Sequence, residues 1–271
     1  MDFPKTNVGG IQVSRLICGS NGFLGYSHFS RARDVWLREY FTAERIAQVI
    51  EKFVRLGINA VMGPTEEKLH AAIQQVRDRT GQDIVFICTP GGPTADEVMP
   101  GIEWCAEHDV RICMPHMNYT DTNLVLADRR ITGLERLAAR IRALDMVPGL
   151  STHRPETIVV ADAAGYDVET YILPYNSIGF LCPLETDWVA KVINETPKPV
   201  MCIKPLAAGR ILPPTGLGFV FSSCKPIDMV VIGTISTYEA EEDVTIARQI
   251  LTASKEKIPL AYSRSKEVVK R

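Results

Sequence analysis

The stretch INAVMGPTEEKLHAAIQQVRDRTGQDIVFICT, residues 58–89, contains the pattern that decides the fold. Two short apolar, β-branched runs, 58–63 and 83–89, flank a segment, 66–81, in which apolar residues recur with the period of a helix. Continuous apolar runs of this length are typical of strands buried on both faces. An amphipathic helix between two such strands connects parallel neighbours of one sheet. The stretch therefore predicts a strand–helix–strand unit.

The same alternation continues along the whole chain. Further apolar strand runs lie at 15–19, 110–115, 146–150, 170–175, 199–204 and 229–234. Further helical segments lie at 42–57, 131–144 and 238–253. Thr42 is an expected N-cap and Gly57 an expected C-cap. Ahead of the first strand, FPKTNVGGIQVSR (3–15) predicts a hairpin with Gly9 and Gly10 at its turn. Eight strands with intervening helices predict an α/β fold: a closed (β/α)8 TIM barrel with an N-terminal hairpin cap, as a single domain over 1–271.

Composition and charge limit the functional classes. The chain has 271 residues, of which 46% are hydrophobic and 23% charged, as in ordinary globular proteins. Its 30 Lys and Arg against 32 Asp and Glu give a net charge of -2, which argues against a nucleic-acid partner. No apolar run is long enough to span a bilayer and the first residues do not resemble a secretion signal, so we expect a cytoplasmic protein with a small-molecule substrate. Its seven cysteines form no C-x-x-C pair and are expected to be reduced.

Polar residues gather where the predicted strands end. Active sites of such barrels lie at the carboxyl ends of the strands, so residues at these positions are expected to share one rim. Three of the five histidines belong to this group. The rim residues expected to carry function are Tyr26, His28, His116, Ser151, His153, Asn176, Lys204, Gly233, Thr234 and Ser236. The remaining histidines, His70 and His108, are expected inside a helix and just before a strand, in solvated or structural roles.

The ordered segments resemble the aldo-keto reductase superfamily. GGIQVSRLICGSNGF (9–23) is similar to the opening of these enzymes, in which a capping hairpin leads to the first strand. TAERIAQVIEKFVRLGIN (42–59) resembles their first helix, and GLSTHRPETI (149–158) with YILPYNSIGF (171–180) resembles strands five and six. VMCIKPLAAGRIL (200–212) and VVIGTISTYEAEEDV (230–244) resemble strands seven and eight. The resemblance covers nearly the whole chain and implies the same barrel.

The resemblance implies a divergent member that lacks most of the catalytic tetrad. These enzymes use an Asp, a Tyr, a Lys and a His, with the Tyr as the proton donor to a carbonyl. Met62 and Gly63 stand in the Asp region, no Tyr follows, and Pro90 takes the position of the Lys. His116 alone matches the family's pattern. Ordinary aldehyde reduction by the family's mechanism is therefore not expected.

Cofactor contacts follow from the same resemblance. Ser151 corresponds to a residue that touches the nicotinamide amide, and the loops containing Lys204 and Gly233 to Ser236 correspond to those that hold the pyrophosphate and adenosine. Asn176 follows strand six and joins this set. A nicotinamide cofactor, NAD or NADP, is thus expected. Acidic residues at the start of the last helix, Glu239 first among them, would repel a 2′-phosphate and favour NAD.

Three functional interpretations remain open. The first is an NAD(P)-linked oxidoreductase that acts on a small polar carbonyl or alcohol, with His116, Lys204, Tyr26 and His28 as its catalytic set. The second is a metal-assisted barrel enzyme in which His28, His116 and His153 bind a divalent metal, with Glu66 or Glu67 as a further ligand. The third is a non-catalytic small-molecule binder. The oligomeric state is left open.

Overall fold

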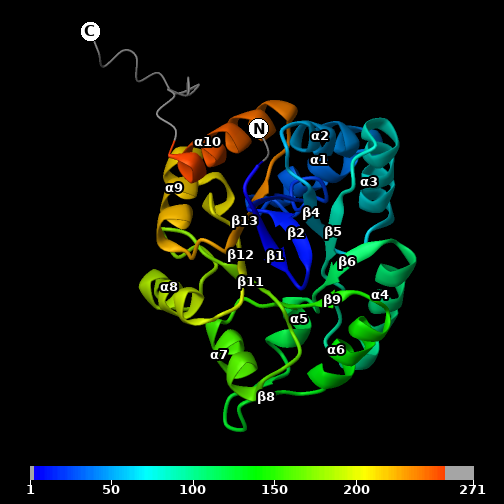
Figure 1. Cartoon of the computed structure of the whole chain (residues 1–271). Helices are drawn as coiled ribbons and strands as arrows, with labels where there is room; N and C mark the ends of the chain where they lie inside the picture. The colour runs from blue at the N-terminus through cyan, green and yellow to red at the C-terminus, as the bar shows by residue number, and fades with distance from the viewer. Residues whose placement is uncertain (1–2, 254–271) are drawn as a thin grey trace.

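A closed barrel of parallel strands forms the centre of the chain, as the computed structural model shows for residues 3–253 (Figure 1). The barrel strands are β3 (Leu16–Gly19), β4 (Ala60–Gly63), β5 (Val85–Cys88), β6 (Val110–Cys113), β9 (Val147–Pro148), β10 (Leu150–Ser151), β11 (Tyr171–Pro174), β12 (Val200–Ile203) and β13 (Met229–Gly233). β9 pairs with β6 and β10 with β11, so these two short strands together form the fifth barrel position. The N–H of Gly149 donates to Cys113 O at 3.1 Å and that of Leu150 to Thr170 O at 3.0 Å. These bonds to opposite neighbours close the sheet, which confirms the predicted TIM barrel.

The N-terminal hairpin plugs one end of the barrel. β1 (Lys5–Val8) pairs antiparallel with β2 (Ile11–Ser14), and Gly9 and Gly10 both have positive φ at the turn, as their sequence predicts. Val8 and Val13 of this hairpin pack with the side chains that fill the barrel interior. Those interior residues come from alternate strand positions: Ile17, Ala60, Met62, Val85, Ile87, Ile112, Met114, Val147, Ile172, Met201, Met229 and Val231.

Helices surround the barrel and bury the other face of each strand in a second, larger apolar layer. They are α2 (Ala43–Arg55), α3 (Glu67–Thr80), α4 (Ala95–Glu107), α6 (Leu134–Ala143), α7 (Pro155–Ala164), α8 (Thr186–Glu195), α9 (Pro213–Ser223) and α10 (Thr237–Thr252). Thr42 caps α2 by accepting the Arg45 N–H, and Gly57 follows the helix with φ of +91°. The predicted N-cap is confirmed, whereas the C-cap is Leu56 and Gly57 lies one residue beyond it. Between residues 3 and 253, no helix is long and apolar enough to cross a membrane.

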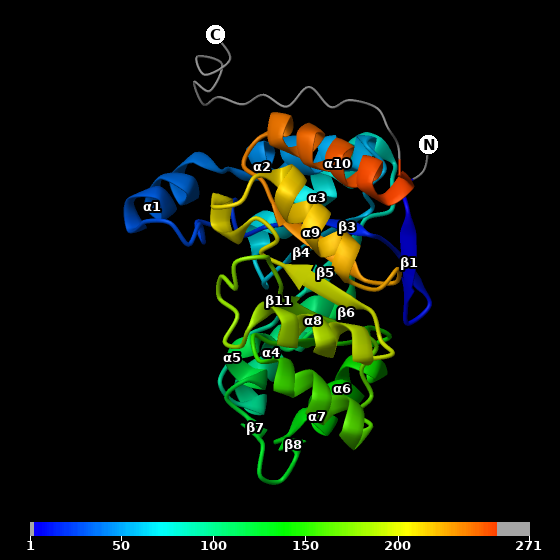
Figure 2. The same cartoon turned by 90° about the vertical axis from the view of Figure 1, so that its left-hand side faces the viewer.

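Two segments at the rim contain structure that the sequence pattern did not indicate. The stretch 21–41, for which the sequence pattern predicts neither helix nor strand, contains helix α1 (Arg31–Tyr40), whose N-cap Ser30 accepts the Arg33 N–H. Only Leu37 of this helix is buried, so it has no apolar stripe to reveal its period. The connection after β6 contains α5 (Met117–Thr120) and a hairpin of β7 (Leu124–Val125) and β8 (Arg130–Ile131). Figure 2 shows α1 and α5 at the end of the barrel opposite the β1–β2 hairpin.

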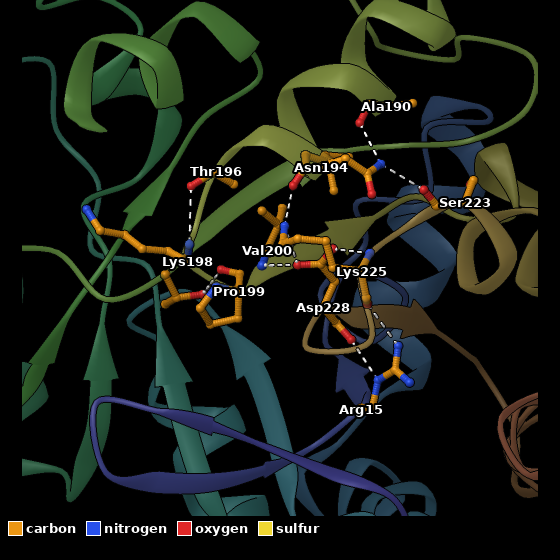
Figure 3. A network of polar contacts seen from close by, with 12 residues as sticks. Arg15, Ala190, Asn194, Thr196, Lys198, Pro199, Val200, Ser223, Lys225 and Asp228 are labelled. Atoms are coloured by element: carbon orange, nitrogen blue, oxygen red, sulfur yellow. Dashed lines mark hydrogen bonds and ion pairs between the residues drawn. The ribbon is translucent and has the colours of Figure 1, made fainter. Parts of the chain in front are cut away.

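A buried polar network joins several elements at the hairpin end of the barrel (Figure 3). Asp228, which has no exposed surface, accepts the N–H groups of Val200 and Lys225 and pairs with the Lys225 ammonium at 2.9 Å. The Arg15 guanidinium donates to the carbonyl oxygens of Asp228 and Lys225. The network thereby fixes the start of β12 and β13 against the segment that enters β3.

Candidate active site

Lys204 lies at the centre of a polar cluster at the carboxyl end of the barrel strands. It follows β12 directly and adopts a left-handed backbone conformation with φ of +61°. Its Nζ lies 3.4 Å from Nε2 of His28, which also has a positive φ of +53°. Burial lowers the pKa of the Lys204 ammonium to about 8. A cation with such a pKa exchanges its proton near neutral pH.

His116 belongs to the same cluster. It follows β6, and its Nδ1 lies 3.0 Å from Oδ1 of Asn118, an oxygen that also accepts the Gly92 N–H. The Asn118 N–H also lies 3.4 Å from Nδ1. Because the contact with Oδ1 is the shorter of the two and that oxygen can only accept, we assign the proton to Nδ1 and the free lone pair to Nε2. Burial lowers the pKa of His116, and the nearby Lys204 ammonium lowers it further. His116 is therefore a neutral imidazole with an available proton acceptor at pH 7.

His153 is the third imidazole of the cluster. Asp121 positions its loop, since one carboxylate oxygen accepts the His153 N–H at 2.9 Å and the other accepts the Thr152 hydroxyl. Burial lowers the pKa of His153 to about 4, with contributions from the charges of Lys204, His116 and His28. The charges of Lys204, His116 and His28 all act on His153, so we group the four side chains as one cluster at the rim. Their joint role stays a prediction.

The electrostatic character of the cluster is cationic. Arg210 lies with its guanidinium carbon 4.4 Å from the centre of the Phe180 ring, and its charge lowers the pKa of His28. The nearest carboxylates are already engaged: Asp34 accepts the Ser27 N–H and hydroxyl, and Asp121 binds its own loop. The cluster is consequently suited to an anionic or electron-rich group.

Tyr26 does not join the cluster. Its side chain is 55% exposed, and no hydrogen bond or ring contact within residues 3–253 links it to Lys204 or to the rim histidines. In the same connection Gly25 has φ of +73°, and Asp34 accepts the Ser27 N–H just before His28. Tyr26 thus lies outside the cluster in this structure, and its catalytic role stays a prediction.

The rim histidines that were predicted as alternative metal ligands do not form a compact group. In the described chain, His28, His116 and His153 do not bring a nitrogen each to within 4.8 Å of one another, whereas the set that does meet this spacing lies elsewhere. Glu66 is not part of that set, and Glu67 points to two other histidines. The rim imidazoles therefore do not form a preformed metal centre.

The residues predicted to bind a cofactor differ from one another in exposure and in the face of the sheet on which they lie. Gly233 is exposed at the end of β13. A Cβ atom added there would have no other atom within 4 Å, so the space next to this residue is open. Ser151 alternates with the outward-facing Leu150 and is buried on the inner side. Thr234 is buried on the helix side of the sheet, in phase with Ile232, and its hydroxyl has no hydrogen-bond partner among the described residues.

Asn176 and Ser236 are largely committed to their own loops. The Asn176 amide donates to Phe180 O at 2.9 Å and accepts the Phe180 N–H at 2.8 Å, so it shapes the loop after β11. Ser236 caps α10 by accepting the Glu239 N–H, and the Glu239 carboxylate accepts the Ile235 N–H at 2.7 Å. A carboxylate thus already occupies the N-terminal end of α10.

Phe180 and Cys182 are cluster neighbours that the sequence reasoning missed. The Phe180 and His28 rings meet edge to face, with 6.3 Å between their centroids. Burial raises the pKa of the Cys182 thiol, and the charge of Lys204 acts in the opposite direction. The signal available in the sequence was the apolar run FLC (180–182) directly after the predicted strand 170–175 and its loop.

Acid titration should reveal the buried position of His153. Its pKa is about 4 in the folded chain and near 6.5 when unfolded, so the unfolded state binds more protons between these values. We expect the wild type to lose up to about 3 kcal/mol relative to His153→Gln as the pH falls from 7 to 4. Urea unfolding of both proteins across this range measures the difference. Parallel curves would show that His153 titrates normally.

Comparisons with known proteins place the fold. No family model matches this sequence, and no curated protein matches it at a significant level. Among solved structures, a candidate aldo-keto reductase from Pseudomonas aeruginosa aligns with a TM-score of 0.69 and 19% identity, over 92% of this chain and 97% of the other. The glycerol dehydrogenase from Gluconobacter oxydans aligns with a TM-score of 0.64 and 10% identity, over 94% and 98% of the two chains.

A third structure includes a cofactor. The aldo/keto reductase from Klebsiella pneumoniae, in complex with NADP and acetate, aligns with a TM-score of 0.59 and 13% identity, over 99% of this chain and 94% of the other. Similarities at such identities establish the architecture and leave the reaction open. With its plugging hairpin and closed barrel, this chain has the fold of the aldo-keto reductases.

Proposed function

We propose that the chain is a divergent aldo-keto-reductase-like oxidoreductase that interconverts a small polar alcohol and its carbonyl with a nicotinamide cofactor. The observation that carries this proposal is the convergence of Lys204, His28, His116 and His153 at the carboxyl ends of the strands. The similarity of the barrel to structures described as a glycerol dehydrogenase and as an NADP complex supports it.

His116 supplies the acid–base function in this proposal. Its free Nε2 accepts the proton of a substrate hydroxyl, and in the reverse direction the imidazolium returns that proton to the carbonyl oxygen. Asn118 holds the ring in the required tautomer. Lys204 holds an anionic or electron-rich group of the substrate, with His28 accepting one of its N–H groups.

The residues present fit a nicotinamide cofactor. The open space over Gly233 allows a close approach of the pyrophosphate to the backbone, and Ser151 provides a hydroxyl on the inner side. The cofactor, when bound, accepts or donates hydride. Because the Glu239 carboxylate lies on the Ile235 N–H, a 2′-phosphate there would meet a like charge, which favours NAD over NADP.

Cofactor binding and turnover together test the proposal. We expect the protein to bind NADH more tightly than NADPH in a fluorescence titration, and to turn over small carbonyls that carry a carboxylate. Simple aldehydes should be reduced poorly, since Gly63 and Pro90 replace acid–base groups that are typically worth about 10²–10⁴-fold each. Failure to bind either dinucleotide would reject the oxidoreductase and favour the small-molecule binder.

A further inference from the structure

A second group of imidazole and carboxylate side chains lies outside the barrel, between α3 and α4. Glu67 and His70 are three residues apart on α3, and His108 is the C-cap of α4. One carboxylate oxygen and one nitrogen from each imidazole lie within 4.8 Å of one another. The sequence pattern placed His70 and His108 in unrelated positions, whereas packing of the two helices brings them together.

Trp104 fixes two of the three side chains. Its indole N–H donates to Glu67 Oε1 at 2.6 Å, and its ring stacks on His108 with 3.9 Å between centroids and 13° between planes. The Trp104 carbonyl lies 2.7 Å from His108 Nδ1, so that nitrogen carries the proton and Nε2 has the lone pair. Nε2 lies 3.4 Å from the oriented Glu67 oxygen. A metal-binding histidine usually donates its other ring N–H to a carbonyl or carboxylate, as His108 Nδ1 does to the Trp104 carbonyl.

His70 completes the group. Its ring lies 4.6 Å from that of His108, edge to face. The Gln74 amide nitrogen lies 2.9 Å from its Nε2, so Nδ1 is the ring nitrogen that Gln74 leaves available for a metal. The neutral imidazole and the charged carboxylate are the protonation states in which these groups bind cations.

We propose that Glu67, His70 and His108 bind a Zn²⁺ ion that joins α3 to α4. Two imidazoles and one carboxylate are a common zinc ligand set, whereas Mg²⁺ and Ca²⁺ prefer oxygen ligands alone. The Glu67 side chain is 72% exposed, so solvent completes a four-coordinate site. The ion links the helices that follow β4 and β5, and it acts on stability because it binds the folded chain.

Zinc titration of the EDTA-treated full chain tests this site. We expect calorimetry to show one bound Zn²⁺ per chain and the Tm to rise with zinc. Glu67→Gln, His70→Gln and His108→Gln should each weaken the affinity by more than about 10-fold. Glu66→Gln is the matched control, because it removes the neighbouring carboxylate at the N-cap of α3, which lies outside the group, and it should leave the affinity unchanged.

Tryptophan fluorescence tests where the ion binds. In a Trp36→Phe, Trp188→Phe background, Co²⁺ should quench the fluorescence of Trp104, and Zn²⁺ should reverse the quenching. Several results would overturn the proposal: zinc affinity weaker than about 1 mM, equal affinity in wild type and the three ligand variants, or loss of binding in His116→Ala, which would place the ion at the rim.

Discussion

Replacement of Asp228 by alanine is expected to lower the free energy of unfolding by about 3–5 kcal/mol, because it removes one partner of a buried charged network. The Lys225 side chain is only 15% exposed and would lose its carboxylate partner. The Val200 N–H, which donates to Asp228 at 2.8 Å, would be left buried without an acceptor. Because these groups lie at the hairpin end of the barrel, the change should act on stability alone (Figure 3).

Urea unfolding at pH 7 measures this effect, with two further variants as references. Asp228→Asn keeps the side-chain shape and one acceptor oxygen, so we expect a smaller loss. Asp78→Ala removes an exposed aspartate of α3 and should change stability by no more than about 0.5 kcal/mol. Equal stability of Asp228→Ala and Asp78→Ala would contradict the importance of the network.

The sequence predicted the barrel because each of its decisive signals is local. Thr42 and Gly57 mark the ends of a helix through the backbone groups next to them, and Gly9 with Gly10 selects the hairpin turn. Strand runs buried on both faces are apolar throughout and need no knowledge of their partners. Helix α1 was missed because burial of Leu37 alone gives no periodic pattern.

Part of the site could be predicted for the same reason. Strand order places His116, His153 and Lys204 at one rim, since all three follow parallel strands of one barrel. The distinction between Tyr26 and His28 was not predictable, because it depends on a left-handed residue and on the anchoring of Asp34 within a long connection. The meeting of Glu67 with His108 depends on how α4 packs on α3, which no local pattern describes.

The largest functional effect is expected for His116→Ala. Loss of the imidazole that we propose as the proton acceptor at the rim should lower kcat by about 10²–10⁴-fold, while the affinity for the dinucleotide stays within about twofold. Steady-state kinetics and a fluorescence titration of NADH separate the two quantities. Arg136→Gln, a change to an exposed side chain of α6 that belongs to neither the cluster nor the predicted cofactor residues, is the control for both.

Asn118→Ala tests whether His116 acts as a base or merely shapes its loop. The Asn118 hydrogen bond raises the pKa of His116 against the effect of burial, so its removal should lower that pKa further. In alcohol oxidation the neutral imidazole is the active form, and the acid limb of the kcat profile should therefore move to lower pH. A structural role would reduce activity without moving this limb. An unchanged kcat in His116→Ala would remove the basis for oxidoreductase chemistry at the rim and leave the cationic cluster as a binding site for an anion.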